Sequence, residues 1–284
     1  MRDASHTVTV TLSVPSFDQD AVLALVSDWP LHGVLQHNDH VEVSLPADAW
    51  TDAHRTALAD WLDEAGYDEA DVRLVPPHNW NRAWEEAVTP VRAGRFLLTP
   101  TWADVPPEHA DATVIEIDPK MSFGTGHHAT TRLVLRLLPN AVSPGARVLD
   151  AGTGTGVLAI AAVRCGAASV VAFDVRDAAV ENATENVARN DVADRVTLHV
   201  GTINAVPETS VNVVCANITR EVVRDLLPAF RARLASGGAL LLSGILERDR
   251  GTMVDAAAAH DFALQDEATE DGWWAGRFAR HASG

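Results

Sequence analysis

Residues 148–156, VLDAGTGTG, decide the fold of this chain. An apolar stretch ending in Asp150 runs into the alternate glycines Gly152, Gly154 and Gly156, and an apolar, helix-forming segment follows. Glycine lets the backbone turn sharply and approach a ligand closely, and a helix that starts here offers free backbone N–H groups. The pattern predicts a strand, a ligand-binding turn and a helix, but it does not choose the ligand.

Strands and helices alternate on either side of this turn. Alternation at this spacing predicts a parallel sheet with helices on both faces, the arrangement of a Rossmann-like α/β fold. The predicted strands span residues 147–150, 170–173, 196–200, 211–216 and 239–243, and the predicted helices span 130–138, 157–165, 178–189 and 221–234.

The first 75 residues have a different rhythm, which predicts a small α+β unit. Expected there are a strand over 6–14, a helix over 18–29, a hairpin around 37–39, a helix over 51–65 and a strand over 72–75. This βαββαβ order fits a ferredoxin-like fold. Pro76 and Pro77 end the unit, and strands over 95–98 and 113–117 open the next one. We therefore predict domains at 1–75 and 95–284, joined by a linker over 76–94.

The linker is expected to contain a short helix over residues 78–88. Its Trp80 and Trp84 fall four positions apart, on one helix face. These side chains serve either as a pivot between the two domains or as anchors in a core, and the sequence leaves both readings open.

The composition narrows the class of partner. The 284 residues include 39 acidic and 22 basic side chains, for a formal net charge of −17, and Lys120 is the only lysine. This balance argues against direct binding of nucleic acid and allows a basic protein partner. Adaptation to a salty cytoplasm is an alternative explanation of the acidic composition. Two cysteines exclude a disulfide scaffold, and without a long apolar run or signal-peptide core we expect a cytoplasmic protein and no membrane.

Two acidic residues stand where predicted strands end. Asp174 follows the second strand, about 20 residues after the glycine turn, where a carboxylate accepts hydrogen bonds from a ribose diol. Capping of the next helix, for which Asp177 is also available, is the alternative. Asp150, just before the turn, suits the amino-acid end of a cationic cofactor, unless the amides of the turn simply satisfy it.

These features fit both an NAD enzyme and an S-adenosylmethionine enzyme. The glycine run favours the second, because Val157 occupies the position where a dinucleotide-binding turn prefers glycine or alanine.

A second glycine loop, MSFGTGHHATT over residues 121–131, precedes the helix predicted from residue 130. Gly124, Thr125 and Gly126 form a turn rich in donors that can cover a bound cofactor. The alternative is that Thr130 or Thr131 simply caps the helix. No metal is expected at His127 and His128, because adjacent histidines usually point apart and no carboxylate lies at helical ligand spacing.

Asn217 ends the apolar stretch VCAN, at the edge of the sheet where ligands bind in such folds. Its amide can both donate and accept hydrogen bonds. An asparagine at the end of a strand is also a common turn former, so the residue alone does not decide between the two roles.

Together these motifs resemble the PrmA family, the methyltransferases of ribosomal protein eleven of the large subunit. The resemblance covers nearly the whole chain, and the order and spacing of five motifs match. They are FGTGHHATT (123–131), VLDAGTGTGVLAIAA (148–162), AFDV (172–175), ANI (216–218) and LSGIL (242–246). This chain departs from the family in having Thr153 and Thr155 where cysteine and serine are common, Ala129 where proline is common, and TRE at 219–221 after ANI.

The resemblance implies a class I S-adenosylmethionine-dependent methyltransferase domain preceded by a domain that recognises the substrate. It implies methyl transfer to lysine ε-amines and the N-terminal α-amine of the basic ribosomal protein. The family's cofactor contacts carry over to Thr131, Gly152, Asp174 and Asn217.

We hypothesise that Asn217 also serves catalysis by orienting the amine, because no His, Asp or Glu in the sequence is clearly a general base. Alternatives are a related methyltransferase for another protein or a small amine, an NAD-dependent oxidoreductase, or an adaptor that has kept the fold.

Overall fold

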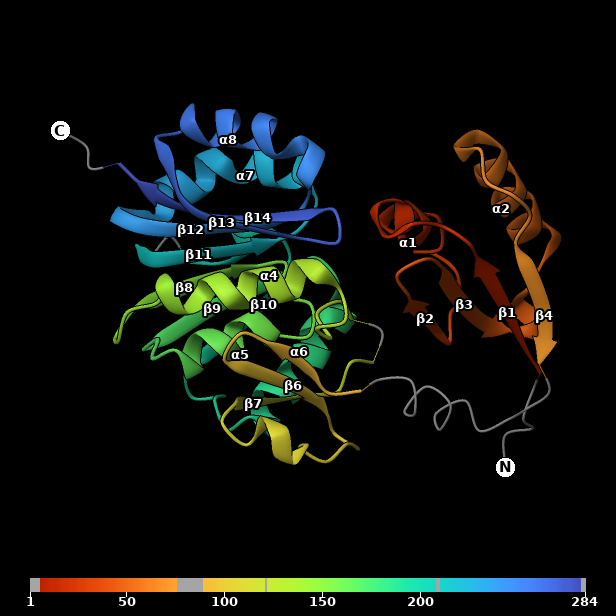
Figure 1. Cartoon of the computed structure of the whole chain (residues 1–284), viewed down its shortest axis with the longest axis horizontal. Helices are drawn as coiled ribbons and strands as arrows, with labels where there is room; N and C mark the ends of the chain where they lie inside the picture. Colours follow the sequence, from red (N-terminus) through yellow and green to blue (C-terminus); the bar gives the residue numbers. More distant parts are fainter. Residues whose placement is uncertain (1–5, 76–88, 121, 208–209, 282–284) are drawn as a thin grey trace. The chain divides into compact units, whose positions relative to one another are not determined.

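The structure, a computed structural model, describes residues 6–75, 89–120, 122–207 and 210–281. The chain divides into two compact units, Met1–Val88 and Thr89–Gly284, here called unit 1 and unit 2 (Figure 1). Unit 1 has its own hydrophobic core, and unit 2 has a core on each face of its main sheet.

Unit 1 is an antiparallel sheet combined with two longer helices. In chain order it contains β1 (Thr7–Leu12), α1 (Gln19–Leu25), β2 (Gly33–Gln36), β3 (Val41–Pro46), α2 (Asp52–Ala65) and β4 (Asp71–Val75). The strands pair antiparallel in the order β2-β3-β1-β4. This order and pairing confirm the predicted ferredoxin-like fold.

The core of unit 1 arises from period-2 alternation in its central strands. Val8 and Val10 of β1 and Val43 of β3 are buried on one face of the sheet. Val22 of α1 and Leu58 of α2 belong to the same apolar cluster. The sheet therefore buries one face beneath its helices.

α1 is shorter than the helix predicted over residues 18–29. It ends at Leu25, and the next residue, Val26, already has φ −93° and ψ 3°. Trp29 precedes Pro30, whose ring disfavours helical geometry at the residue before it. The Trp29 ring packs edge-on against Trp50, with centroids 5.7 Å apart.

The boundary region differs from the predicted linker. The predicted helix over 78–88, with Trp80 and Trp84, lies outside the described residues. Within 76–94, a range assigned to the linker, a short strand β5 (Val91–Ala93) forms, because Gly94 at φ 60° turns the chain back onto β6 (Phe96–Pro100). β6 and its parallel partner β7 (Thr113–Ile117) are the strands predicted over 95–98 and 113–117.

Unit 2 is built on a mostly parallel sheet with helices on both faces (Figure 1). Its strands are β8 (Arg147–Ala151), β9 (Ser169–Asp174), β10 (Val196–Val200), β11 (Val211–Asn217), β12 (Leu234–Leu246), β13 (Phe262–Glu270) and β14 (Trp273–Arg280). They lie in the order β10-β9-β8-β11-β12-β14-β13. The first five of these pair parallel, and β14 runs antiparallel to both of its neighbours.

The helices of unit 2 are α4 (Ala129–Leu137), α5 (Val157–Arg164), α6 (Asp177–Arg189), α7 (Arg220–Arg233) and α8 (Arg250–Ala258). The central strands are mostly apolar because both of their faces are covered. In β11, Val213 and Cys215 pack on the side of α4 and α5, while Val214 and Ala216 pack on the side of α7 and α8.

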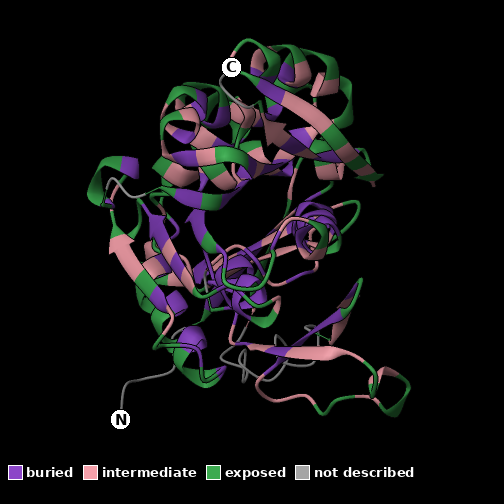
Figure 2. Ribbon diagram, turned by 90° about the vertical axis from the view of Figure 1, so that its left-hand side faces the viewer, coloured by how far each residue is buried: buried purple, intermediate pink, exposed green. Residues whose placement is uncertain are grey.

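α5 is buried along almost its whole length (Figure 2). It contacts β8 and β9 of the main sheet and also β7 of the small sheet β5-β6-β7, so apolar residues are required all around it. Even so, no helix in the described part of the chain is both long and apolar enough to cross a membrane.

The end of the chain holds elements that the sequence reading did not predict. β12 extends well beyond the predicted 239–243, and α8, β13 and β14 follow it. The sequence does contain a signal for the hairpin of β13 and β14, because Asp-Gly strongly favours a two-residue turn. Asp271 and Gly272 join β13 to β14 with φ values of 50° and 77°.

Candidate functional site

The structure places the predicted site residues at the carboxyl edge of the main sheet. Asp150, Asp174 and Asn217 lie at or next to the ends of β8, β9 and β11, which are neighbours in the order β9-β8-β11. From β8 the sheet continues through β9 and β10 on one side and through β11 and β12 on the other. Ligands in open α/β sheets bind in the crevice at such a switch point.

The glycine turn after β8 depends on backbone geometry that only glycine adopts freely. Gly152, Gly154 and Gly156 have φ values of 73°, 54° and 83°. A Cβ on Gly154 would lie 2.3 Å from the backbone oxygen of Phe123, an impossible approach. The alternate glycines are therefore required by the turn itself and by the loop that crosses it.

The second glycine loop is fastened to the first through Thr155. The Thr155 backbone N–H donates to the Phe123 carbonyl at 2.9 Å, and its hydroxyl donates to the Gly124 carbonyl at 2.9 Å. Gly126 is equally constrained, since a Cβ there would lie 2.3 Å from a methyl carbon of Leu98. A serine hydroxyl can make the same bond, which explains why threonine is acceptable at residue 155.

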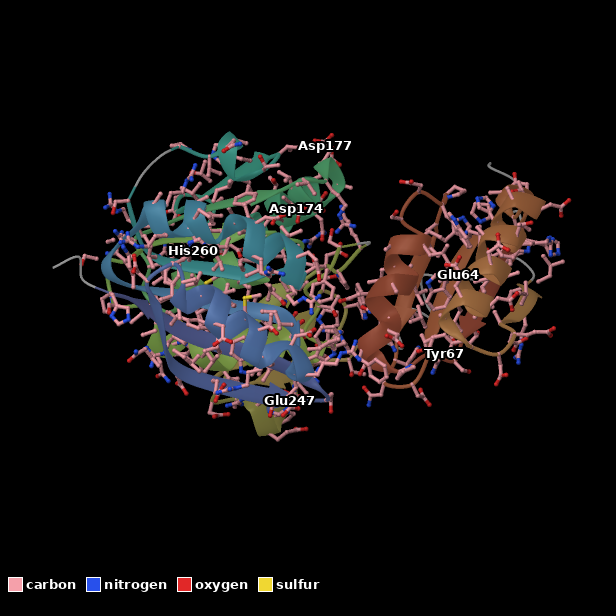
Figure 3. The ribbon with its side chains drawn as sticks, turned by 90° about the horizontal axis from the view of Figure 1, so that it is seen from above. Glu64, Tyr67, Asp174, Asp177, Glu247 and His260 are labelled. Carbon is pink, nitrogen blue, oxygen red and sulfur yellow. The ribbon has the colours of Figure 1, made fainter. Side chains whose placement is uncertain are left out.

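Asp174 joins the end of β9 to the glycine turn (Figure 3). One carboxylate oxygen accepts the Gly154 N–H at 3.0 Å, and the other accepts the Arg176 N–H at 3.1 Å. Arg176, not Asp174, is the N-cap residue of α6, so the alternative of helix capping is wrong. Each oxygen keeps a further lone pair for a ligand hydroxyl.

Asp150 is fully buried beneath the same turn. Oδ2 accepts the Thr153 hydroxyl at 2.7 Å, and Oδ1 has no hydrogen-bond partner among the described residues. Burial raises the pKa of the Asp150 carboxyl to about 7, the Thr153 hydrogen bond opposes this, and the charge of Asp174 adds to it. A nearby cation would favour the ionised form.

Asn217 and Thr131 come together although they are 86 positions apart in the sequence. The Asn217 amide nitrogen donates to the Thr131 hydroxyl at 3.4 Å, and Thr131 is fully buried in α4. The Asn217 Oδ1 atom is covered and has no hydrogen-bond partner among the described residues. A half-buried amide is thus held by its nitrogen with its acceptor oxygen unused.

Ile218, which the sequence reading quoted only as part of ANI, lies where three motifs meet. A Cβ on Gly152 would lie 2.3 Å from its side chain, and one on Gly244 would lie 2.4 Å from its backbone oxygen. The ANI segment therefore fits between the glycine turn and LSGIL, with no room for a residue larger than glycine at 152 or 244.

Ser243, the residue before Gly244, is buried, and its hydroxyl donates to the carbonyls of Thr130 and Trp274, each at 3.3 Å.

The histidine pair serves the loop before α4. His128 is the N-cap residue of α4, and its ring accepts the Thr130 N–H, so neither Thr130 nor Thr131 caps the helix. The ring packs edge-on against Phe123 and Trp273, at centroid distances of 5.3 and 4.8 Å. Burial, assisted by the charge of Arg132, lowers the pKa of His128 to about 4, so the ring is neutral at pH 7.

Sequence reading missed a row of asparagines on α6. Asn186 and Asn190 each pair through both amide atoms with the backbone of one residue at the open edge of β7. For Asn190 and Glu116 the two bonds measure 3.0 and 2.7 Å, and for Asn186 and Asp118 they measure 2.8 and 3.1 Å. Asn182 donates to the same Asp118 carbonyl at 3.0 Å. These side chains make the hydrogen bonds to the edge of β7 that a neighbouring strand would otherwise make.

Asn186 also reaches the glycine turn, because its amide nitrogen lies 3.0 Å from the Thr155 carbonyl. One side chain thereby connects the segment that leads into the FGTG loop with the turn that the loop crosses. The four-residue spacing of the asparagines is visible in the sequence, but their partners in and after β7 lie 64 to 74 positions away, and Thr155 lies 31 positions from Asn186.

The predicted site residues differ in what a ligand can reach. Gly152, Thr125 and Asn217 are partly exposed, and Asp174 keeps a small exposed fraction. Gly124, Gly126, Gly154, Asp150 and Thr131 are buried, so they fix the exposed ones in place. A carboxylate with spare acceptors beside a cradle of glycines fits the ribose and the amino-acid portion of S-adenosylmethionine.

The fold and the site together define a class I S-adenosylmethionine-dependent methyltransferase. The profile of the PrmA family, ribosomal protein L11 methyltransferase, matches residues 19–281. The chain therefore belongs to the PrmA family of protein methyltransferases, and the alternative of an NAD-dependent oxidoreductase is wrong.

Individual relatives agree with the family profile. The ribosomal protein L11 methyltransferase of Symbiobacterium thermophilum is 38% identical over 236 residues, 81% of this chain and 77% of that protein. That of Pelotomaculum thermopropionicum is 44% identical over 210 residues, 74% and 68% of the two proteins. The crystal structure of ribosomal protein L11 methylase from Lactobacillus delbrueckii subsp. bulgaricus is 29% identical, with a TM-score of 0.63 over 68% of this chain and 99% of that one.

Proposed function

We propose that this enzyme methylates lysine ε-amino groups and the N-terminal α-amino group of ribosomal protein L11, with Asn217 orienting the amine. The observation that carries the proposal is the Asn217 amide. Its nitrogen is held by Thr131 at 3.4 Å, while its covered Oδ1 atom has no partner among the described residues. Because Asn217 is only half-buried at the edge of the sheet, rotation of its amide would offer this acceptor to an N–H of the target amine.

Residues on the neighbouring strands would hold the cofactor. The Asp174 carboxylate would accept the ribose hydroxyls, the backbone at Gly152 would lie against the ligand, and Asp150 would face its amino-acid portion. When bound, S-adenosylmethionine supplies a methyl group on a positively charged sulfur, which a neutral amine nitrogen can accept. Thr131 is fully buried and acts by holding Asn217.

Catalysis here depends on position more than on proton transfer. A lysine amine, with an ordinary pKa of about 10.4, must lose its proton before its lone pair can react, and removal from water favours the neutral form. Asn217 Oδ1 accepts one N–H of the neutral amine and so fixes the direction of the lone pair. The proton that the lysine ammonium loses beforehand passes to water, and methyl transfer then leaves a neutral thioether and places the positive charge on the methylated nitrogen. Close to this site, Arg220 lies 2.7 Å from Asp249 and 2.6 Å from Glu221, which fixes the start of α7 after Asn217.

Unit 1 is proposed to bind the ribosomal protein. It has its own core, and the chain carries a net charge of −17 that attracts a basic partner. We also propose that the enzyme acts in the cytoplasm, where its protein substrate is made.

The substitution Asn217→Ala tests the role of the amide. It should lower methylation of ribosomal protein L11 by about 100-fold, because the amine loses its orienting acceptor. Incorporated methyl groups are counted by mass spectrometry, circular dichroism shows that the variant is folded, and calorimetry measures its cofactor affinity separately. The matched control is Asn204→Ala, at an exposed asparagine. Turnover of Asn217→Ala close to that of wild type would refute the proposed role.

A further inference from the structure

A second cluster of chemically active side chains lies in unit 1, on the tip of the β2–β3 hairpin. Gln36 pairs with Val41 at the ends of the strands, and the His37 N–H donates to the His40 carbonyl at 2.9 Å. His37 and His40 therefore face each other across a two-residue turn. Because side chains alternate along a strand, Glu42 emerges on the same face as His40.

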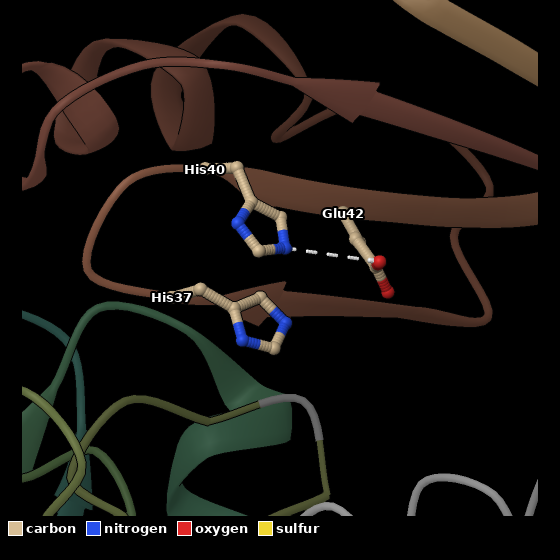
Figure 4. A group of neighbouring side chains, drawn as sticks. All are labelled: His37, His40 and Glu42. Carbon is tan, nitrogen blue, oxygen red and sulfur yellow. Dashed lines mark ion pairs between the residues drawn. The ribbon is translucent and has the colours of Figure 1, made fainter.

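The three side chains converge on one another (Figure 4). One ligand atom from each of His37, His40 and Glu42 lies within 4.8 Å of the others. The Nε2 atom of His40 is 3.9 Å from a carboxylate oxygen of Glu42. The two imidazole rings are stacked, with centroids 4.1 Å apart and planes inclined by 9°. All three are at least partly exposed, so an ion from solvent can reach them.

Asp39, in the turn, sets the orientation of one imidazole. Its carboxylate lies 2.7 Å from Nδ1 of His40, so the ring proton is held at Nδ1 and the lone pair stays on Nε2, the nitrogen that faces Glu42. A carboxylate behind a histidine in this way is the usual support of a metal-binding imidazole.

The backbone beneath the two histidines is tied to the core of unit 1. Gln19, which is 1% exposed, donates from its amide nitrogen to the His37 carbonyl at 2.6 Å. The same nitrogen lies 3.3 Å from the carbonyls of His40 and Val14. A buried side chain thus fixes the positions from which both imidazoles project, as a preorganised binding site requires.

We propose that His37, His40 and Glu42 form a binding site for a divalent transition metal of the Zn²⁺ class, with Asp39 supporting His40. Imidazole nitrogen and carboxylate oxygen are the ligands that such ions prefer, and the two carboxylates balance the charge of the dication. Ligand atoms of a tetrahedral zinc are about 3.4 Å apart, so rotation of these exposed side chains is sufficient. The fourth position remains for water.

Zinc titration of the full chain tests this site. Protein without a histidine tag is freed of metal with EDTA, and Zn²⁺ is titrated against a competing fluorescent chelator, with stoichiometry from native mass spectrometry. We expect one Zn²⁺ per chain. His37→Ala and His40→Ala should each weaken binding at least 10-fold, and Asp39→Ala should have a smaller effect, since Asp39 acts through His40.

The controls separate this site from general affinity of histidines for metal. His281→Ala, at an exposed histidine in unit 2, should leave the affinity unchanged. Glu42→Gln keeps shape and polarity, so it should fold as wild type and weaken Zn²⁺ binding several-fold. Absence of binding by wild type at micromolar Zn²⁺, or equal affinity of wild type, His40→Ala and Glu42→Gln, would overturn the proposal. The readout is metal affinity, so the result does not depend on the methyltransferase activity.

Discussion

At the scale of single residues, burial sets the behaviour of Asp150. Burial raises the pKa of its carboxyl from 3.8 to about 7. Between these values the folded chain keeps a proton that the unfolded chain has lost. This extra proton contributes to the free energy of unfolding. The contribution is fully present below 3.8, the pKa of Asp150 in the unfolded chain, and is lost as the pH rises through about 7, its pKa in the folded chain. Above about pH 7 the buried Asp150 carboxylate is therefore ionised at a cost to the fold, and its charge then suits a cationic ligand.

Asp150→Asn should remove this pH dependence. Each unit of pKa corresponds to about 1.4 kcal/mol, so the free energy of unfolding of the variant relative to wild type should rise by on the order of 4 kcal/mol between pH 4 and pH 8. Urea unfolding of both proteins at a series of pH values, followed by tryptophan fluorescence, measures the difference. A difference that stays constant with pH would contradict the assigned ionisation.

At the scale of elements, a helix completes the edge of a sheet. Asn186 and Asn190 of α6 bond to both backbone groups of residues in and after β7, where the next strand of the small sheet would otherwise lie. Asn186 also bonds to the Thr155 carbonyl. α6 thereby helps to position the FGTG loop, which Thr155 holds across the proposed cofactor site.

Asn186→Ala should weaken both the fold and cofactor binding. It leaves the Asp118 N–H and the buried Thr155 carbonyl without their side-chain partner, while Asn182 still donates to the Asp118 carbonyl, and an unpaired buried group costs about 1–3 kcal/mol. Because Thr155 holds the FGTG loop, the affinity for S-adenosylmethionine, measured by calorimetry, should fall several-fold. Glu181→Ala, at an exposed position of the same helix, is the control. Stability and affinity matching that control would show that the asparagine row has no such role.

Local patterns in the sequence were sufficient for most elements and insufficient for long-range partners. The strand–glycine–helix pattern around Gly152 is local, so it predicted β8, the turn and α5. The contact of Asn217 with Thr131 spans 86 positions and depends on how α4 lies over the sheet. β13 was missed because its residues, FALQDEATE, show no regular alternation of apolar and polar side chains, although Asp271 and Gly272 signalled its turn. β5 has too few residues for a period to show.

At the scale of the whole molecule, the chain combines two units with separate cores. The core of unit 1 draws only on residues of that unit, and the predicted site residues all lie in unit 2. We therefore expect cofactor binding and recognition of the protein substrate to be separable properties.

A shortened chain of residues 89–284 should bind S-adenosylmethionine with an affinity within about 3-fold of the full chain, because every cofactor contact is retained. Its methylation of intact ribosomal protein L11 should fall by about 100-fold, since loss of a recognition domain removes the binding energy that positions the amine. Calorimetry and methyl incorporation provide the two values. Full activity of the shortened chain on the intact protein would exclude unit 1 from recognition.

Mass spectrometry of ribosomal protein L11, after incubation with the full chain and S-adenosylmethionine, shows whether this enzyme transfers methyl groups to its amines. We expect mass increases in steps of one methyl group, located by fragmentation on lysine ε-amines and the N-terminal α-amine, and absent when the cofactor is withheld. An unchanged mass, or methyl groups only on residues without an amine, would refute the proposed activity.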